Sequence, residues 1–279
     1  MSDPSFRIMG VVNVTPDSFS DGGLFLDADK AIAHGTELAK QGADILDIGG
    51  ESTRPGAEPV SADEELRRVL PVSEGLADAG TQISIDTSKA AVASAALKGG
   101  AALVNDVTAL RGDPRMVEVV AESGVGCCLM HMLGEPRTMQ DEPRYGDVVS
   151  EVKAFLSERM AFALANGIAE EQIILDPGIG FGKTIEHNLE LLRRLDELVA
   201  LGRPVLVGFS RKSFLGRITG REVDERLAST IAVNVLAFER GARVFRVHDV
   251  APTKDALAVA AATVRRGWSA TTTPRSSTT

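Results

Sequence analysis

The chain has 279 residues, of which 44% are hydrophobic and 25% charged, a balance typical of folded globular proteins rather than of disordered or fibrous ones. Its net charge of −9 argues against a nucleic-acid-binding surface, which is usually basic, and no apolar run reaches the roughly 20 residues that span a membrane. The start of the chain lacks the pattern of an export signal and the only two cysteines are adjacent, which excludes a structural disulfide, so we expect a cytoplasmic protein that binds neither nucleic acid nor membrane.

Eight short apolar segments, each closed by a polar or charged residue, are expected to be strands. They are continuous and rich in Val, Ile and Leu, as are the strands of a parallel sheet that is covered on both faces. In chain order they are residues 8–13, 45–49, 82–86, 103–106, 126–131, 173–176, 205–209 and 244–248. Helical patterns lie between them and end near glycines such as Gly42, Gly99, Gly124 and Gly241, since glycine readily adopts the left-handed conformation of a helix C-cap.

Eight strand–helix units in a chain of this size most economically close into a (β/α)8 TIM barrel, a single α/β domain. An open, doubly wound sheet of eight strands is the alternative. We expect the barrel to occupy residues 6–267 and a disordered C-terminal tail, rich in Ser and Thr, to occupy residues 268–279. The long connections 15–23 and 50–60 are expected to be functional loops.

The residues that close the strands mark the candidate site, because the active sites of such barrels lie at the carboxyl ends of the strands. Taken singly, each such residue is more often a helix N-cap or a loop anchor. Taken together, they predict a ligand site at the mouth of the barrel. They are Asn13, Asp47, Asp86, Asn105, Asp106, His131, Asp176, Ser210, Arg211, Lys212, Arg246 and His248.

The types of these residues favour a flat, nitrogen-rich ligand. A carboxylate can accept two parallel N–H bonds from an amino-pyrimidinone edge, while Lys212 and Asn105 can serve the carbonyl and ring nitrogens. Aromatic residues make up only 4% of the chain, which argues against a sugar site or a surface of stacked bases. The pattern therefore predicts a pterin or a purine.

Arg246 and His248 alternate around Val247, so both side chains are expected to leave the last strand on the same face. The pair predicts a phosphate or diphosphate site, with a surface ion pair as the alternative. We expect the heterocycle on one wall of the cavity and this phosphorylated group on the opposite wall.

No motif predicts a tightly held metal or a nucleotide. The four histidines lack the spacing of a zinc site. Magnesium can instead enter with a diphosphate and take one protein oxygen, for which Asn13 is the candidate. The glycine-rich stretch 178–184 resembles a P-loop but is too short to be one.

Several segments are similar to the signature motifs of bacterial dihydropteroate synthases. The two longest are residues 9–23 and 47–56, and the others are residues 84–87, 105–106, 130–132, 176–181, 210–216 and 246–249. The resemblance covers about residues 6–266. It departs at residues 107–110, where many members of the family have small residues.

The resemblance implies a transferase of folate biosynthesis. Its members condense 6-hydroxymethyl-7,8-dihydropterin diphosphate with para-aminobenzoate in an SN1-like substitution, releasing diphosphate and forming 7,8-dihydropteroate, and they are sulfonamide targets. By this resemblance the catalytic residues are Asp86, Asp176, Lys212, Arg246 and His248. The pterin is held by Asp86, Asn105, Asp176 and Lys212, the diphosphate by Asn13, Arg246 and His248 with Mg2+ on Asn13, and the para-aminobenzoate and covering loops involve Phe19, Asp21, Thr53, Arg54, Pro55 and Ser213.

Other functions stay open at this point. A methyltetrahydrofolate-dependent methyltransferase would use the same pterin-binding barrel, a lyase would use Lys212 in a Schiff base, and a pterin-binding protein would have no turnover. We also expect a homodimer through residues 228–238 and 256–264, which are apolar on more than one side. The alternative is that these are two buried helices of a monomer.

Overall fold

Eight parallel strands form the inner ring of the molecule. The computed structural model describes residues 5–15, 24–53 and 56–264, with the backbone alone at residues 24–27. The strands lie side by side in the order β6-β5-β4-β3-β2-β1-β8-β7, and a parallel bridge between Leu175 and Val205 connects the two ends of this order. Their bounds are β1 (Arg7–Asn13), β2 (Ile45–Gly49), β3 (Gln82–Asp86), β4 (Leu103–Asp106), β5 (Gly126–Met130), β6 (Ile173–Asp176), β7 (Leu206–Val207) and β8 (Val244–Val247).

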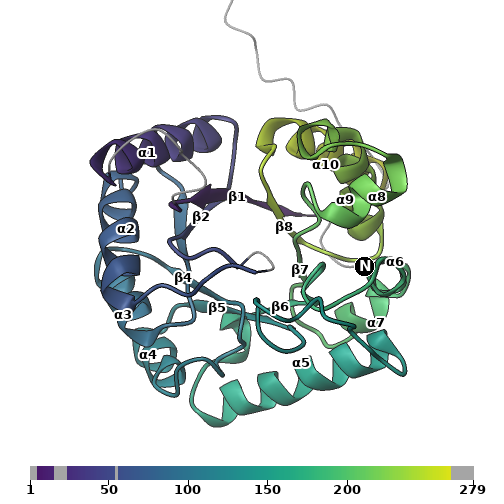
Figure 1. Cartoon of the computed structure of the whole chain (residues 1–279), viewed down its shortest axis with the longest axis horizontal. Coiled ribbons are helices and arrows are strands. Elements are labelled where there is room, and N and C mark those ends of the chain that lie inside the picture. Colours follow the sequence, from purple (N-terminus) through teal and green to yellow (C-terminus); the bar gives the residue numbers. More distant parts are fainter. Residues whose placement is uncertain (1–4, 16–23, 54–55, 265–279) are drawn as a thin grey trace, which may run out of the picture.

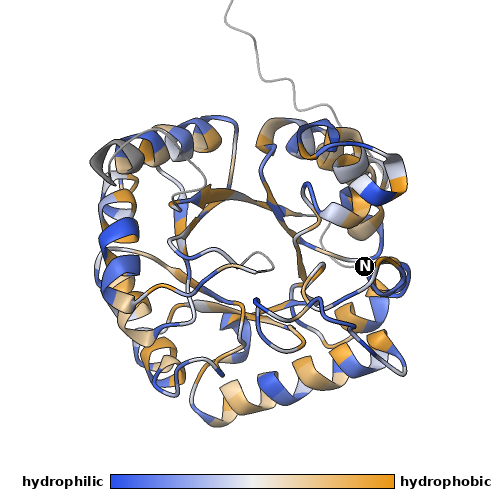
Figure 2. Cartoon of the chain, viewed as in Figure 1, coloured by the Kyte–Doolittle hydropathy of each residue, from blue (hydrophilic) through white to orange (hydrophobic). Residues whose placement is uncertain are grey.

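Helices surround this ring (Figure 1). They are α1 (Leu24–Lys40), α2 (Ala62–Gly75), α3 (Ala90–Lys98), α4 (Met116–Ser123), α5 (Val148–Ala165), α6 (Ile185–Arg193), α7 (Leu195–Val199), α8 (Ser213–Thr219), α9 (Leu227–Glu239) and α10 (Val250–Val264). Figure 2 shows the strands largely hydrophobic, with hydrophilic residues concentrated on the helices and loops. The predicted TIM barrel is thus confirmed, and the open sheet was the wrong alternative. None of the helices in the described residues is long and apolar enough to cross a membrane.

Most strand boundaries agree with the sequence prediction, and the differences have local causes. Strand β7 is two residues long: Leu206 and Val207 pair with β8, whereas the residues just before the strand contact β6, where Leu175 donates a backbone hydrogen bond to Pro204. Among the helix-ending glycines, Gly99 has an ordinary φ of −81° and the next residue, Gly100, adopts the left-handed conformation at 101°. The predicted boundary at residue 267 and the tail 268–279 lie outside the described residues.

The inside of the barrel is filled by an apolar floor with a polar layer above it. Side chains alternate in and out along a strand, so every second residue faces the interior. The floor, a separate cluster of buried residues, consists of Met9, Ile45, Leu103, Cys128, Ile174, Leu206 and Val244. Two positions further along the chain lie the polar residues Asp47, Asn105, Asp176 and Arg246, together with Val11, Met130 and Gly208. The outward-facing residues, such as Cys127, join the larger core between strands and helices.

A buried carboxylate holds the connection from β4 to α4 in an unusual conformation. Ala109 and Leu110 have φ angles of 52° and 64°, in the left-handed region that side chains disfavour. Asp106 accepts hydrogen bonds from the backbone N–H groups of Thr108 and Leu110, both at 2.8 Å. Arg159 donates to the carbonyl of Ala109 at 2.9 Å. The fully buried Asp106 therefore offsets the backbone strain in this connection.

Replacing this carboxylate should destabilise the fold. Asp106→Ala removes the acceptor of Leu110 N–H and leaves a strained turn, so we expect a loss of about 3 kcal/mol in the free energy of unfolding. Urea denaturation measures this loss. The control Asp63→Ala changes an exposed carboxylate in the first turn of α2 and should cost less than about 1 kcal/mol. Equal losses in the two variants would show that Asp106 does not hold the turn.

Candidate active site

The guanidinium group of Arg246 connects three strands at the mouth of the barrel, and Asp47 connects it to a fourth. Its Nε donates to Asp47 Oδ2 at 2.6 Å, and its Nη2 donates to Asp86 Oδ2 at 2.8 Å. Asn105 Nδ2 donates to the same oxygen of Asp47 at 3.0 Å. Asp47 is fully buried, whereas the side chain of Arg246 is 24% exposed. The arginine therefore lies inside the barrel with its orientation fixed by two carboxylates.

This contact corrects the expected layout of the site. The sequence suggested that the pterin-binding carboxylates and the phosphate-binding residues occupy opposite walls. Asp86 and Arg246 instead form an ion pair, because the long arginine side chain reaches from β8 past β1 and β2 to β3. The candidate subsites for the heterocycle and for the phosphate are thus contiguous.

Asp47 is a residue that the sequence analysis placed in the strand-end set without assigning it a role. The structure shows that it orients both Arg246 and Asn105. Its position two residues beyond the floor residue Ile45 was the signal that could have identified it.

Asp176 and Lys212 lie on the other side of the mouth. Asp176 is 6% exposed, and its Oδ1 accepts a hydrogen bond from Gly178 N at 2.7 Å. Burial raises the pKa of Asp176 to about 6, against the opposing effects of Gly178 N–H and nearby lysines. The Lys212 ammonium lies 4.2 Å from the centre of the Phe181 ring, a cation–π contact. Burial and the nearby Arg246 lower the pKa of Lys212 to about 8.

The pKa of Asp86 is also raised, first by burial and then by the neighbouring carboxylate of Asp47, while Arg246 opposes this shift. Three carboxylates and several cations thus share a small buried volume. Each group in it is sensitive to the charge of its neighbours.

His248 follows β8 and contacts Ser210, which follows the shortened β7. Both the backbone N–H and the ring Nδ1 of His248 lie near Ser210 Oγ, at 3.1 and 3.0 Å. Oγ accepts from the backbone N–H, and in the tautomer in which its own hydrogen is donated to Nδ1 the ring proton lies on Nε2. Burial and the positive charge of Arg246 lower the pKa of His248 to about 4. His248 is therefore a neutral side chain, and in this tautomer its Nε2–H can donate to a ligand.

The remaining predicted residues have different locations. Asn13 ends β1 and is half-buried, level with Gly49 at the end of β2. Ser213 begins α8 and is exposed, and Thr53 is a partly exposed residue of the loop after β2. Phe19, Asp21, Arg54 and Pro55 lie outside the described residues.

Two strand-end residues are loop anchors rather than ligands. Asp106 faces away from the barrel interior and holds the turn described above. Arg211, at a φ of 57°, pairs with both carboxylate oxygens of Asp249, at 2.7 and 3.0 Å. This pair connects the segments that carry Lys212 and His248. For Asp106 and Arg211, the alternative of a loop anchor was the right interpretation.

Lys183 is a buried residue that the sequence analysis did not assign to the site. It is 3% exposed and contacts the His131 ring at 3.0 Å, behind the turn that follows Asp176. The sequence feature that marks Lys183 is the glycine-rich stretch 178–184, which contains it and resembles a P-loop.

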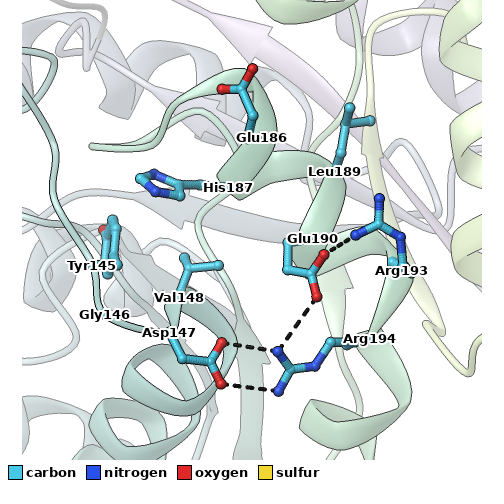
Figure 3. Close-up of a pocket in the computed structure, with 10 residues that line it drawn as sticks. All are labelled: Tyr145, Gly146, Asp147, Val148, Glu186, His187, Leu189, Glu190, Arg193 and Arg194. Carbon is cyan, nitrogen blue, oxygen red and sulfur yellow. Dashed lines mark hydrogen bonds and ion pairs between the residues drawn. The ribbon is translucent and has the colours of Figure 1, made fainter.

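The structure contains a cavity outside the barrel, between the start of α5 and helix α6 (Figure 3). Its volume is about 530 Å3. Four of the charged side chains drawn there pair with one another: Arg194 contacts Asp147 and Glu190, and Arg193 contacts Glu190. None of the predicted site residues lines this cavity. The strand-end cluster is therefore the better candidate for the active site.

The chain is similar to known proteins in both sequence and structure. The model of the family described as pterin-binding enzymes matches residues 9–248. The dihydropteroate synthase of Escherichia coli (strain K12) is 47% identical over 259 residues, which is 92% of each chain. A structure of Xanthomonas albilineans dihydropteroate synthase with 4-aminobenzoic acid has a TM-score of 0.87 and 51% identity, covering 91% of this chain and 92% of that chain. The Yersinia pestis dihydropteroate synthase with a sulfonamide drug has a TM-score of 0.89 and 44% identity, covering 94% and 96%.

A substitution at Gly178 should test how tightly the mouth is packed. A Cβ atom there would lie 1.8 Å from the carbonyl oxygen of His131, and the residue has a φ of 67°. We expect Gly178→Ala to destabilise the protein by about 3 kcal/mol or more, measured by thermal and urea unfolding, because the backbone must move.

Gly220 provides the matched control. It has a φ of 70°, but a Cβ atom there would have no neighbour within 4 Å. Gly220→Ala should therefore cost only the conformational strain, about 1 kcal/mol. If Gly178→Ala lowered the free energy of unfolding no more than Gly220→Ala, the close contact between Gly178 and the carbonyl oxygen of His131 would be contradicted.

Proposed function

The chain belongs to the pterin-binding enzymes and, among them, to the dihydropteroate synthases, and on that premise we propose a role for each of its strand-end side chains. It is a transferase that joins para-aminobenzoate to 6-hydroxymethyl-7,8-dihydropterin diphosphate, with release of diphosphate and formation of 7,8-dihydropteroate. The methyltransferase and the protein without turnover are set aside by these relatives. One observation supports our assignment of roles: polar side chains gather at the strand ends, above the apolar floor. They belong to Asp86, Asn105, Asp176, Lys212 and Arg246.

We assign the pterin to Asp86, Asn105, Asp176 and Lys212. The carboxylates accept N–H groups of the amino-pyrimidinone edge, and the amide and ammonium serve its acceptors. The contact of Lys212 with the Phe181 ring supports a charged ammonium group rather than the neutral amine that a Schiff-base nucleophile needs.

We assign the diphosphate to Arg246, His248 and Asn13. Arg246 presents its fixed guanidinium group at the mouth, and His248 donates from Nε2 without needing a positive charge of its own. Because the two subsites are contiguous, the bond between the pterin methylene and the diphosphate would lie directly over the pair of Asp86 and Arg246.

Magnesium fits this site only as a partner of the diphosphate. Asn13 offers one amide oxygen, and no group of three or more His, Cys, Asp or Glu residues is arranged for a metal within the described ranges 5–15, 24–53 and 56–264. A magnesium ion can keep most of its waters and take a single protein oxygen. When bound there, it would supply positive charge to the departing diphosphate.

The substitution is proposed to be SN1-like. The carbon–oxygen bond breaks first, the electron pair leaves with the diphosphate, and the arylamine then attacks the methylene and loses a proton. Arg246 stabilises the departing anion, and Asp176 stabilises the positive charge on the pterin fragment. Thr53 and Arg54 of one loop, with Phe19 and Asp21 of the other, would cover the substrates and exclude water. Ser213 and Pro55 would meet the para-aminobenzoate.

Further proposals concern the protein as a whole. Sulfonamides would compete for the para-aminobenzoate subsite, as the sulfonamide complex of the Yersinia pestis relative suggests. A cytoplasmic location is consistent with two cysteines that are free and buried.

A homodimer is also proposed, through α9 and α10. These helices are not buried on all sides, and large apolar side chains remain exposed on them. They are Leu227 (38%), Leu236 (40%), Val259 (67%) and Val264 (51%).

The proposed roles predict the outcome of a diphosphate-release assay. With the wild type, release should require para-aminobenzoate and magnesium. Asp176→Asn should lower kcat about 100-fold because it removes a charge that stabilises the transition state, while inhibition by added diphosphate changes little. Asp196→Asn, an exposed change in α7, is the control and should have no effect. An unchanged kcat in Asp176→Asn would remove that carboxylate from the mechanism.

The dependence of kcat/KM on pH should be bell-shaped. Below a pH of about 7 Asp86 becomes protonated, and below about 6 Asp176 follows, so the rate falls in two steps. Above a pH of about 8, Lys212 loses its proton and the rate falls again. Asp176→Asn should remove the step near pH 6 and leave the step of Asp86, as measured in buffers of constant ionic strength. A step near pH 6 that persists in this variant belongs to another group.

The oligomeric state tests the proposed interface. Val259→Lys should convert the dimer into a monomer in light scattering, because it places a charge in an apolar contact. Leu164→Lys is the matched control, since Leu164 is 41% exposed on α5, a different part of the outer ring (Figure 1). A wild type that is monomeric, or a dimer that tolerates Val259→Lys, contradicts the interface.

A further inference from the structure

A lysine that touches none of the assigned substrate groups is buried directly behind the turn that follows Asp176. The ammonium group of Lys183 has three acceptors around it: His131 Nδ1 at 3.0 Å, the carbonyl oxygen of Phe181 at 2.9 Å and that of His131 at 3.4 Å. Lys183 is 3% exposed. An ammonium group has three N–H donors, so this arrangement satisfies the charged form of the side chain completely.

The acceptors connect Lys183 to both elements that position Asp176. His131 follows β5, and its backbone N–H donates to the carbonyl of Asp176 at 3.0 Å. Gly178, whose N–H binds the Asp176 carboxylate, is so close to Lys183 that a Cβ atom there would lie 3.4 Å from Nζ. Phe181 carries the ring that receives the Lys212 ammonium. The buried side chain of Lys183 therefore contacts the backbone groups that position Asp176 and the residue whose ring contacts Lys212, two residues assigned to the pterin.

We propose that Lys183 is a positioning residue of the reaction: its buried ammonium group holds the turn after β6 against the end of β5 and keeps the Asp176 carboxylate ionised. This inference rests on the role proposed for Asp176. It goes beyond that role because Lys183 acts through the turn and through its charge, from behind the pterin subsite.

The charges around the two residues are consistent with this inference. Four groups face the carboxylate of Asp176. They are Lys183 on the same loop, Lys212 on the loop after β7, Arg246 on β8 and Cys128 on β5. Burial raises the pKa of the Cys128 thiol well above its usual range, so the thiol is neutral. The cations therefore act together to keep the carboxylate charged despite its burial.

Lys183 itself is cationic in the range where Asp176 titrates. Burial lowers the pKa of Lys183 to about 7, opposed by Asp176, while the positive charge of Lys212 lowers it further. Burial also lowers the pKa of His131 to about 3, with contributions from Lys183 and Arg111, so the His131 ring is neutral and Nδ1 remains an acceptor. At a pH near 6, Lys183 thus carries its proton as Asp176 gains one.

The test is a measurement of the pKa of Asp176 in the free protein, by NMR of aspartate labelled with 13C at the carboxyl group and assigned with Asp176→Asn. Lys183→Met and Lys183→Gln should each raise this pKa by about one unit, which corresponds to a tenfold change in the proton equilibrium. The step of Asp176 in the acid limb of kcat/KM should move upward by the same amount, with a loss of about fivefold to tenfold at pH 6 and recovery toward pH 8. The control Lys98→Met, at an exposed position in the last turn of α3, should move neither.

The two Lys183 variants separate charge from structure. Glutamine keeps hydrogen-bond donors for the carbonyl oxygens but has no charge, so a purely structural role predicts rescue by Lys183→Gln, which would overturn the proposal. An equal loss of rate at every pH would overturn it as well.

A reciprocal measurement protects the test if the Lys183 variants fold poorly. Linkage requires that Asp176 and Lys183 shift each other's pKa by the same amount. In Asp176→Asn, which preserves the shape of the side chain, the pKa of Lys183, followed by NMR of lysine labelled with 13Cε, should fall by about one unit. An unchanged value would show that the two groups are not coupled. These titrations need no catalysis, so their failure is distinct from a failure of the diphosphate-release assay.

Discussion

The site depends on one partly buried arginine held by two carboxylates. Withdrawing the guanidinium group of Arg246 from water would be costly without partners, and Asp47 and Asp86 supply them at 2.6 and 2.8 Å. The same carboxylate of Asp47 fixes Asn105. Residues assigned to the heterocycle and the residue assigned to the departing anion therefore share one hydrogen-bonded network, which lies above the apolar floor. Its side chains are oriented before substrate arrives, which is the condition for electrostatic stabilisation of a charged transition state.

Charge balance extends this network across the mouth. Asp176 is buried enough to approach neutrality near pH 6, and the cations of Lys183, Lys212 and Arg246 oppose that tendency. The neutral His248, oriented by Ser210, adds a donor without adding another positive charge to the cluster. Anion binding and carboxylate ionisation thus rely on the same few groups, so a change in the charge of one group should shift the pKa values of the others.

The fold could be predicted from the sequence because its signals are local. Apolar runs of four to six residues ending in a polar residue, repeated eight times, specify β2, β3, β4 and β6 at both ends. The strand-end rule also selected Asp86, Asn105, Asp176 and Arg246, which the structure brings to the same end of the barrel. The contact of Arg246 with Asp86 could not be predicted, since it depends on how far a long side chain reaches across two intervening strands. The importance of Asp47 and Lys183 was missed for a similar reason: their partners lie 199 and 52 residues away in the chain, and no short motif records such contacts.

The central claim is that Asp47 acts through Arg246, and a double-mutant cycle on diphosphate binding tests it most directly. Calorimetry would measure the affinity for inorganic diphosphate in the wild type, Asp47→Asn, Arg246→Met and the double variant. If Asp47 orients the arginine, its substitution should weaken binding only while Arg246 is present, with a coupling energy of about 1–2 kcal/mol between the two changes. Strictly additive effects would contradict the account, because Asp47 and Arg246 would then contribute to the site independently.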